Sequence, residues 1–232
     1  NVATLDMVQQ AQALRSQSLV VSGQMEGKTR LPLPDGADVI AGEAAVDVSK
    51  GIAGDDELLY QLETAVVNWS HQVNDVLKHD SAQPLIDGQH VGPLIELDFW
   101  AKKKANLIYI EEQLKSPTYV RVMEELDGLQ SSYAPLMAKV IGDVESALSE
   151  CEDITMYLEP MRQTFEEVEE IEFAKLHITF QQIMHLLGLV WNNSKSYATP
   201  RQFVVLLRET LNVFIHRIEQ GVEPRTIYNL EP

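Results

Sequence analysis

The sequence predicts an all-α fold: an elongated helical bundle of long antiparallel helices, with a small β-hairpin near the N-terminus. From residue 55 onward, apolar residues recur at alternating steps of three and four, which is the period of one helix face. Prolines and glycines divide this pattern into segments with short connections, as in an antiparallel bundle. Hydrophobic residues make up 45% of the 232 residues, which is enough for a core.

Residues 1–55 form the first predicted domain and differ from the rest of the chain. A hairpin is expected there, because a short strand at residues 19–21 and a return strand at residues 29–33 flank a glycine-containing turn. Pro32 and Pro34 restrict the second strand to the edge of a sheet, since proline has no N–H to donate. The flanking segments are predicted to be a short helix over residues 5–14 and a linker over residues 35–54, which is rich in Ala, Gly and Asp.

Residues 56–232 form the second predicted domain, the helical bundle. Its first helix begins at Asp55 or Asp56, because either carboxylate can cap it. Residues 84–92 interrupt the helical pattern. A second helix is expected over residues 93–115, and a shorter third helix is expected to begin at Pro117. The apolar stripe of the first helix consists of Leu59, Leu62, Val66, Trp69, Val73 and Val76.

Three further helices complete the prediction. Pro160 is expected to end or kink the fourth, because proline removes a backbone donor. A short acidic piece precedes the fifth helix, and a turn at residues 197–200 leads into the last one, which Gly221 ends. The three apolar stripes are Met137, Val140, Val144, Ala147, Cys151, Ile154 and Leu158; then Phe173, Leu176, Phe180, Ile183, Leu187 and Val190; then Phe203, Leu207, Leu211, Phe214 and Ile218.

The composition excludes several classes of protein. The formal net charge of −17 repels nucleic-acid phosphates and anionic lipid. Cys151 is the one cysteine of the sequence, so an intrachain disulfide cannot form and a reducing compartment fits. No apolar run approaches the ~18 residues of a membrane span. The first residue is Asn, no signal-peptide pattern follows it, and we expect a fragment of a longer protein.

The charge is unevenly distributed along the chain. Residues 116–172 hold 14 acidic and 3 basic residues, whereas residues 173–232 hold 4 acidic and 6 basic residues. An acidic stretch of this kind is most often a solvated helix face, although it can also meet a basic partner. The basic residues that we expect to contact a partner are Lys102, Lys103, Lys104, Arg201, Arg208 and Arg217.

The sequence Gly27-Lys28-Thr29 superficially resembles the end of a phosphate-binding loop. Such a loop needs a glycine five residues before the Gly-Lys pair, and Ser22 stands there. The prolines that follow prevent a helix whose amides would hold phosphate. The sequence therefore predicts a hairpin turn and no nucleotide or other cofactor.

Neither a metal site nor a catalytic site is predicted. The six histidines never lie three or four residues apart, the spacing at which two would share one face of a helix. Cys151 lies in an apolar stripe and is expected to fill the core. The run Glu166, Glu167, Glu169 and Glu170 is dense and is therefore expected to be solvated rather than catalytic. Trp69, Trp100 and Trp191 each lie on an apolar face and are expected to pack between helices.

Several short sequences stand out by their order and spacing. They are Trp69-Ser70-His71-Gln72-Val73, Asp80-Ser81-Ala82-Gln83-Pro84-Leu85 and Glu96-Leu97-Asp98-Phe99-Trp100, and they continue through residues 110–117, 131–133, 157–160, 190–194 and 197–200. Together they resemble the tail region of axonemal dynein heavy chains, and they are closer to outer-arm or related two-headed classes. The resemblance covers residues 56–224.

This resemblance implies a non-motor tail fragment located in the cytoplasm, in the cytoskeleton of a ciliary or flagellar axoneme. It implies partners of four kinds: other dynein heavy chains, intermediate and light chains, docking factors, and the doublet microtubule. Tails of that family associate heavy chains and anchor the arm, whereas ATP and Mg bind in a motor domain that is absent here. Two alternatives stay open: an unrelated cytosolic helical scaffold or tethering module, and an enzyme that uses the Gly27-Lys28-Thr29 turn.

Overall fold

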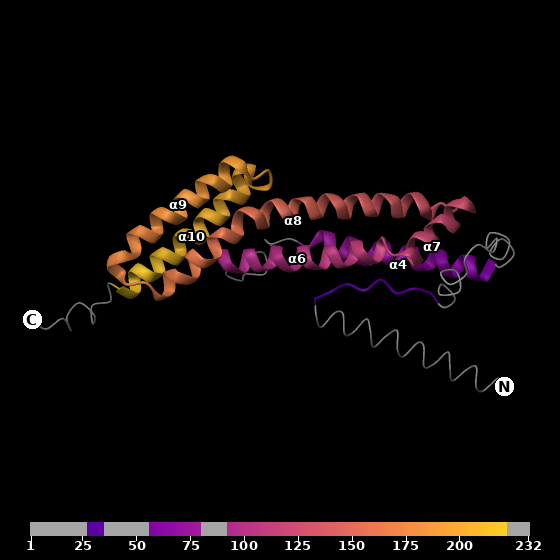
Figure 1. The fold of residues 1–232 in the computed structure, drawn as a ribbon, viewed down its shortest axis with the longest axis horizontal. Helices are drawn as coiled ribbons and strands as arrows, with labels where there is room; N and C mark the ends of the chain where they lie inside the picture. Colours follow the sequence, from indigo (N-terminus) through magenta and orange to yellow (C-terminus); the bar gives the residue numbers. More distant parts are fainter. Residues whose placement is uncertain (1–26, 35–55, 80–91, 222–232) are drawn as a thin grey trace, which may run out of the picture. The chain divides into compact units, whose positions relative to one another are not determined.

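The computed structural model describes residues 27–34, 56–79 and 92–221, and the part that it describes is all-α (Figure 1). This confirms the predicted fold class. The elements are the helices α4 (Asp56–Lys78), α6 (Pro93–Leu114), α7 (Pro117–Gly128), α8 (Tyr133–Glu170), α9 (Leu176–Asn193) and α10 (Pro200–Gly221), with the 3-10 turns η1 (Phe173–Lys175) and η2 (Ser196–Ala198).

The chain divides into two compact units. Among the described residues, unit 1 holds 27–34, 56–79 and 103–148, and unit 2 holds 92–102 and 149–221. The predicted helix over residues 5–14, the strand at 19–21, the linker at 35–54 and the break at 84–91 lie outside the described residues. The predicted domain boundary between residues 55 and 56 stays a prediction.

The buried face of α4 anchors unit 1. The central positions of its predicted stripe, Leu62, Val66, Trp69 and Val73, are buried, as the three-four spacing requires. A lysine from α6 caps the C-terminal end of α4. Lys103 Nζ donates to the carbonyl oxygens of Leu77, at 3.2 Å, and of His79, at 2.6 Å.

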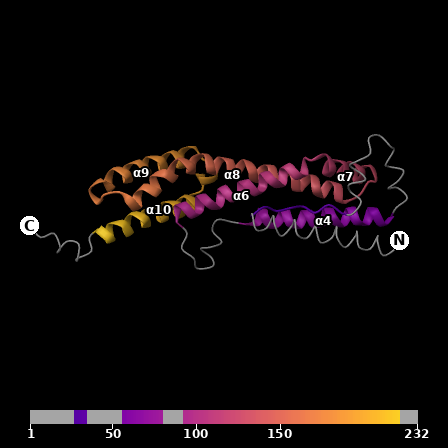
Figure 2. The same ribbon diagram turned by 60° about the horizontal axis from the view of Figure 1, so that its bottom comes forward.

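Residues 27–34 form an extended segment that runs along α4 and α6 within unit 1 (Figures 1 and 2). Gly27 turns the chain with a positive φ of 70°, and the residues after it have no strand assignment. The predicted strand at residues 29–33 is therefore wrong. Its backbone groups bond to helix side chains, so a pairing strand is not needed to satisfy them.

Helix α8 continues through Pro160, so of the two expected effects of this proline the end of the helix is wrong, while a kink stays a prediction. Pro160 lacks the N–H that would bond to the carbonyl of Met156, four residues earlier. The side chain of Met156 is 60% exposed, which puts that carbonyl on the side of the helix where water can reach it. The acidic run that follows belongs to the helix, and Met161, Phe165 and Val168 bury its inner face.

In unit 2, polar side chains tie the turn between α9 and α10 to the helices beneath it. The Tyr197 hydroxyl of η2 donates to Glu96 Oε1 at 2.6 Å, and both residues are buried. Ser194 Oγ, also buried, donates to Asp153 Oδ2 at 2.6 Å. Burial, reinforced by the Glu96 carboxylate, raises the pKa of Tyr197 well above its usual range. The hydroxyl therefore stays protonated and can donate this bond.

Candidate interaction surface

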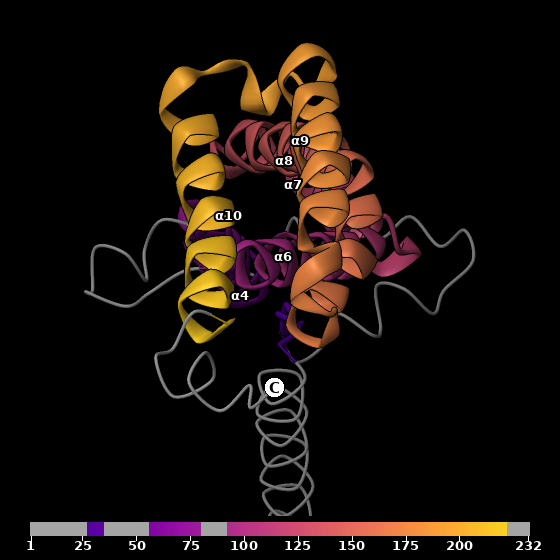
Figure 3. The same ribbon diagram turned by 90° about the vertical axis from the view of Figure 1, so that its left-hand side faces the viewer.

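Helices α9 and α10 form a hairpin that η2 joins at one end (Figure 3). On α9 the buried residues are Leu176, Thr179, Ile183, Leu187 and Val190, which lie on one face as predicted. The rings of Phe180 and Phe214 meet edge to face, with centroids 5.1 Å apart. This contact joins α9 to the buried side of α10.

The buried side of α10 is not the side that its sequence predicts. Leu206, Glu209, Thr210 and Phe214 are buried. Among the predicted stripe residues, Phe203, Leu207 and Leu211 are half-buried and Ile218 is 44% exposed. The helix is rotated within the unit, so that part of its apolar stripe faces solvent.

An exposed stripe therefore runs along α10. Its members follow one another at steps of four and three, so they share one face of the helix. Two of them are strongly exposed, Val204 by 58% and Ile215 by 53%. We call this stripe the α10 outer face; it consists of Val204, Arg208, Leu211, Ile215 and Ile218. Arg208 at its centre brings a guanidinium to the face, and this group pairs with the carboxylate of the neighbouring Glu209 at 3.2 Å.

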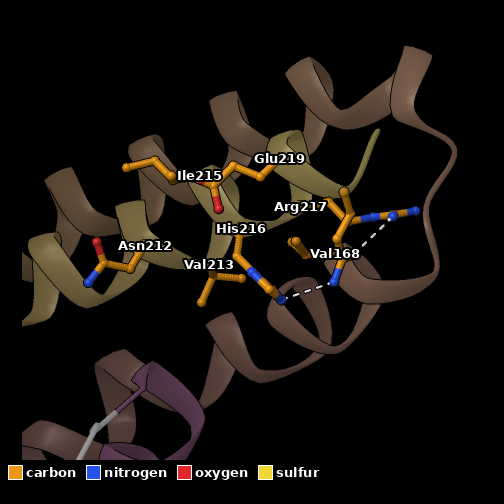
Figure 4. Close-up of a pocket in the computed structure, with 8 residues that line it drawn as sticks. Val168, Asn212, Val213, Ile215, His216, Arg217 and Glu219 are labelled. Atoms are coloured by element: carbon orange, nitrogen blue, oxygen red, sulfur yellow. Dashed lines mark hydrogen bonds between the residues drawn. The ribbon is translucent and has the colours of Figure 1, made fainter. Parts of the chain in front are cut away.

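A hollow of about 730 Å³ lies beside the C-terminal half of α10 (Figure 4). Its lining is mixed in character, with apolar and charged side chains together. The amide nitrogen of Gln220 lies 2.9 Å from His216 Nε2, and Arg217 Nη1 donates to Gln220 Oε1 at 3.4 Å. The lining residues are Val168, Asn212, Val213, Ile215, His216, Arg217, Glu219 and Gln220. Because Ile215 lies both here and on the α10 outer face, the two features adjoin.

The three predicted arginines have different environments. Arg201 is exposed. Arg208 is exposed as well and lies 3.2 Å from the neighbouring Glu209 Oε1. Arg217 is half-buried, and its Nη2 donates to the carbonyl of Ile171 at 2.9 Å, which ties α10 to the end of α8. Arg201 and Arg208 are therefore accessible to a partner, while Arg217 has a structural bond inside unit 2.

The three predicted lysines divide between the units. Lys102 belongs to unit 2 and is exposed, whereas Lys103 and Lys104 belong to unit 1 and are half-buried. Lys103 closes the end of α4, a role that the sequence did not indicate. The contact of these lysines with a partner stays a prediction.

Sequence reasoning missed Val204 and Ile215, and it placed Phe173, which is 50% exposed, in a buried stripe. Trp191 packs against Phe203 of α10 as expected, with ring centroids 4.8 Å apart, and is still 41% exposed. One signal was present in the sequence. The run Val204-Val205-Leu206-Leu207 gives α10 apolar residues on several sides, as in a helix that is covered on more than one face.

Three observations bear on other kinds of site in the described part of the chain. There, no group of three or more His, Cys, Asp or Glu side chains comes close enough together to hold a metal ion. None of the described helices is long and apolar enough to cross a membrane. At the Gly27-Lys28-Thr29 sequence, the Thr29 N–H donates to Asn106 Oδ1, and an extended segment follows in place of a helix. An extended segment does not offer the N-terminal helix amides that hold phosphate in such loops, and the absence of a nucleotide stays a prediction.

Comparison with known proteins identifies the family. Residues 59–232 match the family described as dynein heavy chain, N-terminal region 1. The chain belongs to the dynein heavy chain family. The matched range overlaps residues 56–224, where the sequence resembles the tail region of axonemal dynein heavy chains. The chain is thus part of an axonemal dynein heavy chain, a ciliary or flagellar component of the cytoskeleton.

Individual relatives support this assignment along the whole chain. The fragment is 38% identical to the ciliary dynein beta chain of Tripneustes gratilla over 231 residues, which is 100% of this chain and 5% of that protein. It is 34% identical to dynein axonemal heavy chain 17 of Homo sapiens over 97% of this chain and 5% of that one. It is 35% identical to the flagellar outer-arm dynein beta chain of Chlamydomonas reinhardtii over 94% of this chain and 5% of that one. The dynein tail fragment therefore spans about 5% of the length of these relatives.

Proposed function

We propose that this tail fragment serves assembly in the axonemal dynein arm. In this proposal it helps to associate heavy chains, to bind intermediate and light chains, and to anchor the arm on the doublet microtubule through docking factors. The α10 outer face carries the proposal, because Val204, Ile215 and Ile218 expose apolar side chains along one helix face. Such faces on helices mark protein interaction sites.

The chemistry of the α10 outer face suits a protein partner. Full burial of each large aliphatic side chain contributes about 1.5–3 kcal/mol, so Val204, Ile215 and Ile218 together can anchor a helix. Arg208 and the neighbouring Arg201 would add electrostatic steering toward an acidic partner. The partner proposed here is therefore an amphipathic helix with acidic residues at the rim of its apolar stripe.

The fragment is proposed to have no catalytic step of its own. The ATP and Mg chemistry of the motor is assigned to the part of the heavy chain outside this fragment, because the residues at Gly27-Lys28-Thr29 do not fit a phosphate. Because the chain belongs to the dynein heavy chain family, the alternative of an unrelated cytosolic scaffold or tethering module is wrong.

The test uses the full-length heavy chain in its native arm complex. Val204→Glu combined with Ile215→Glu places two carboxylates on the α10 outer face, where exposed side chains leave the fold of unit 2 intact. Gln181→Glu is the matched control, because it adds a carboxylate at an exposed polar position of the adjacent helix α9.

We expect the double variant to lose an intermediate chain, a light chain or the second heavy chain on co-purification, while the control keeps all of them. If every partner is retained at the wild-type level, the α10 outer face is not an assembly contact. If the heavy chain itself becomes sensitive to proteolysis while its partners stay, another part of the same heavy chain covers this face.

A further inference from the structure

Four side chains of unit 1 hold the extended segment 27–34 by its backbone. They come from three helices: Trp69 from α4, Asn106 and Gln113 from α6, and Tyr119 from α7. We call these four residues the clamp. Its members are far from the segment in sequence, and together with the segment they lie within unit 1.

The amides of Gln113 and Asn106 contact the segment as a neighbouring β-strand would. Gln113 Oε1 accepts from the N–H of Leu31 at 2.9 Å, and its Nε2 donates to the carbonyl of Thr29 at 3.0 Å. Asn106 Oδ1 accepts from the N–H of Thr29 at 2.6 Å, and its Nδ2 donates to Thr29 Oγ1 at 3.1 Å. Two side-chain amides thus satisfy the alternate backbone groups of an extended peptide.

The other two members bond to the next carbonyls along the segment. The Tyr119 hydroxyl donates to the carbonyl of Leu31, and Trp69 Nε1 donates to the carbonyl of Pro32 at 2.6 Å. The rings of Trp69 and Tyr119 also contact each other, with centroids 4.7 Å apart. Leu31 is 1% exposed, so its side chain is the apolar anchor of the segment.

These contacts define the peptide that the clamp can hold. The N–H groups at the positions of Thr29 and Leu31 are required, because both donate to the clamp. In an extended chain the N–H of residue 32 points to the other side, so proline is allowed at Pro32. Of the segment's side chains, the clamp uses the Thr29 hydroxyl and the buried Leu31. Its other hydrogen bonds end on backbone atoms, which are present in almost any sequence.

We propose that the clamp is a peptide-binding site for an extended segment with a leucine anchor, and that residues 27–34 are its tethered, displaceable occupant. The occupant is joined to α4 through residues 35–55, so it binds intramolecularly with the high effective concentration that a tether gives. A free peptide of the same chemistry, supplied by another chain, competes for the same four side chains. This site is distinct from the α10 outer face and does not depend on the function proposed for it.

The experiment uses the full 232-residue chain and a fluorescent synthetic peptide with the sequence of residues 27–34. Leu31→Asp in the protein disables the tethered occupant by removing its anchor and leaves the clamp residues unchanged. Fluorescence anisotropy measures binding of the peptide to this variant and to the wild-type chain. We expect saturable binding to the variant, at least ~10-fold tighter than to the wild type, where the tethered segment competes.

Backbone methylation of the peptide tests the geometry directly. N-methylation at the position of Leu31 removes the N–H that Gln113 accepts and should weaken binding to the variant by about 10-fold. N-methylation at the position of Arg30 is the matched control and should change binding by less than about 3-fold, because in an extended chain its N–H points away from the amides of Asn106 and Gln113. Equal binding of the two methylated peptides, or equal binding to variant and wild-type protein, would overturn the proposal.

A second measurement covers the case in which Leu31→Asp loses its helical circular dichroism. Hydrogen exchange of the wild-type chain then measures how often residues 27–34 are released from the clamp. The amides of Thr29 and Leu31 should exchange through local release of the segment, at least ~10-fold faster than the amides of α6 at the clamp. If they exchange as slowly as those amides, segment and helices open together, and residues 27–34 are an integral part of the fold.

Discussion

The side chain of Trp69 combines burial with two further contacts. It is fully buried on α4, stacks at a tilt on Tyr119 and donates to the carbonyl of Pro32. A residue that joins a helix, a second helix and an extended segment leaves a large cavity when it is truncated.

Trp69→Ala should therefore lower the free energy of unfolding by roughly 3–5 kcal/mol. Urea unfolding followed by circular dichroism measures this change. Trp69→Phe is the informative control, because it keeps most of the ring and removes the bond to Pro32, and should cost less. Wild-type stability in the alanine variant, together with loss of a binding partner, would show that Trp69 acts as a partner anchor.

Tyr119 should make the protein sensitive to alkaline pH. Burial raises the pKa of its hydroxyl from 10.0 to about 12, although nearby Arg30 opposes the shift. Above pH 10 the unfolded chain loses this proton while the folded chain keeps it. The stabilisation is therefore complete below pH 10 and falls as the pH rises to about 12, by up to roughly 2–3 kcal/mol.

Urea unfolding of the wild type and of Tyr119→Phe at several pH values between 9 and 12 would test this dependence. The variant should lose less stability over the window, because it has no hydroxyl to ionise at this position. Tyr60→Phe is the control. Tyr60 is 66% exposed, so its replacement should not change how the free energy of unfolding depends on pH. If the free energy of unfolding falls equally steeply with pH in Tyr119→Phe and in the wild type, the raised pKa of Tyr119 does not cause the loss of stability.

At the scale of elements, the end of α4 depends on a side chain from another helix. The last carbonyls of a helix have no partner within it and must find one elsewhere. Here the Lys103 ammonium of α6 supplies two bonds, to Leu77 and to His79, and its positive charge suits the negative end of the helix dipole.

Lys103→Ala should consequently destabilise the chain by about 1–2 kcal/mol. Lys102→Ala removes the same charge from an exposed neighbouring position and should change stability by less than about 0.5 kcal/mol. Chemical denaturation of both variants side by side gives the comparison. Equal effects would mean that net charge matters here, rather than closure of α4 by Lys103.

At the scale of the whole molecule, the isolated fragment should associate with itself. The exposed apolar side chains of α10 would be buried in the heavy-chain complex proposed above. In the isolated fragment they are accessible to solvent. Sedimentation velocity should show a concentration-dependent rise in mass, which Ile215→Glu suppresses and Gln181→Glu does not. A single monomeric species at all concentrations would rule out an adhesive α10 outer face.

The salt dependence of this self-association distinguishes its electrostatic contribution from its apolar contribution. Contacts of Arg201 and Arg208 with acidic residues should weaken with added salt, since charges are screened over ~10 Å at 0.1 M. Apolar burial by Val204, Ile215 and Ile218 persists at high salt. Association should therefore fall as salt is raised and level off above zero, and a complete loss would point to a purely electrostatic contact.

The helices of the dynein tail fragment can be predicted from sequence, because helix formation depends on local signals. Pro117 and Pro200 begin α7 and α10 as predicted, and the stripe through Leu62, Val66 and Trp69 is buried as its spacing requires. The resemblance of short sequences in order likewise indicated the family that comparison then showed.

Tertiary structure decided what each helix face contacts and how the remaining backbone groups are satisfied. The N–H groups of Thr29 and Leu31 bond to side chains of α6 more than 70 residues away, so local sequence could not replace the expected strand by a clamped segment. Helix α10 has apolar residues on several sides, and only packing against α9, through Phe180 and Phe214, selects which side is buried. Periodicity determines that a helix has an apolar face, whereas its neighbours determine whether that face is covered inside the fragment or left for a partner.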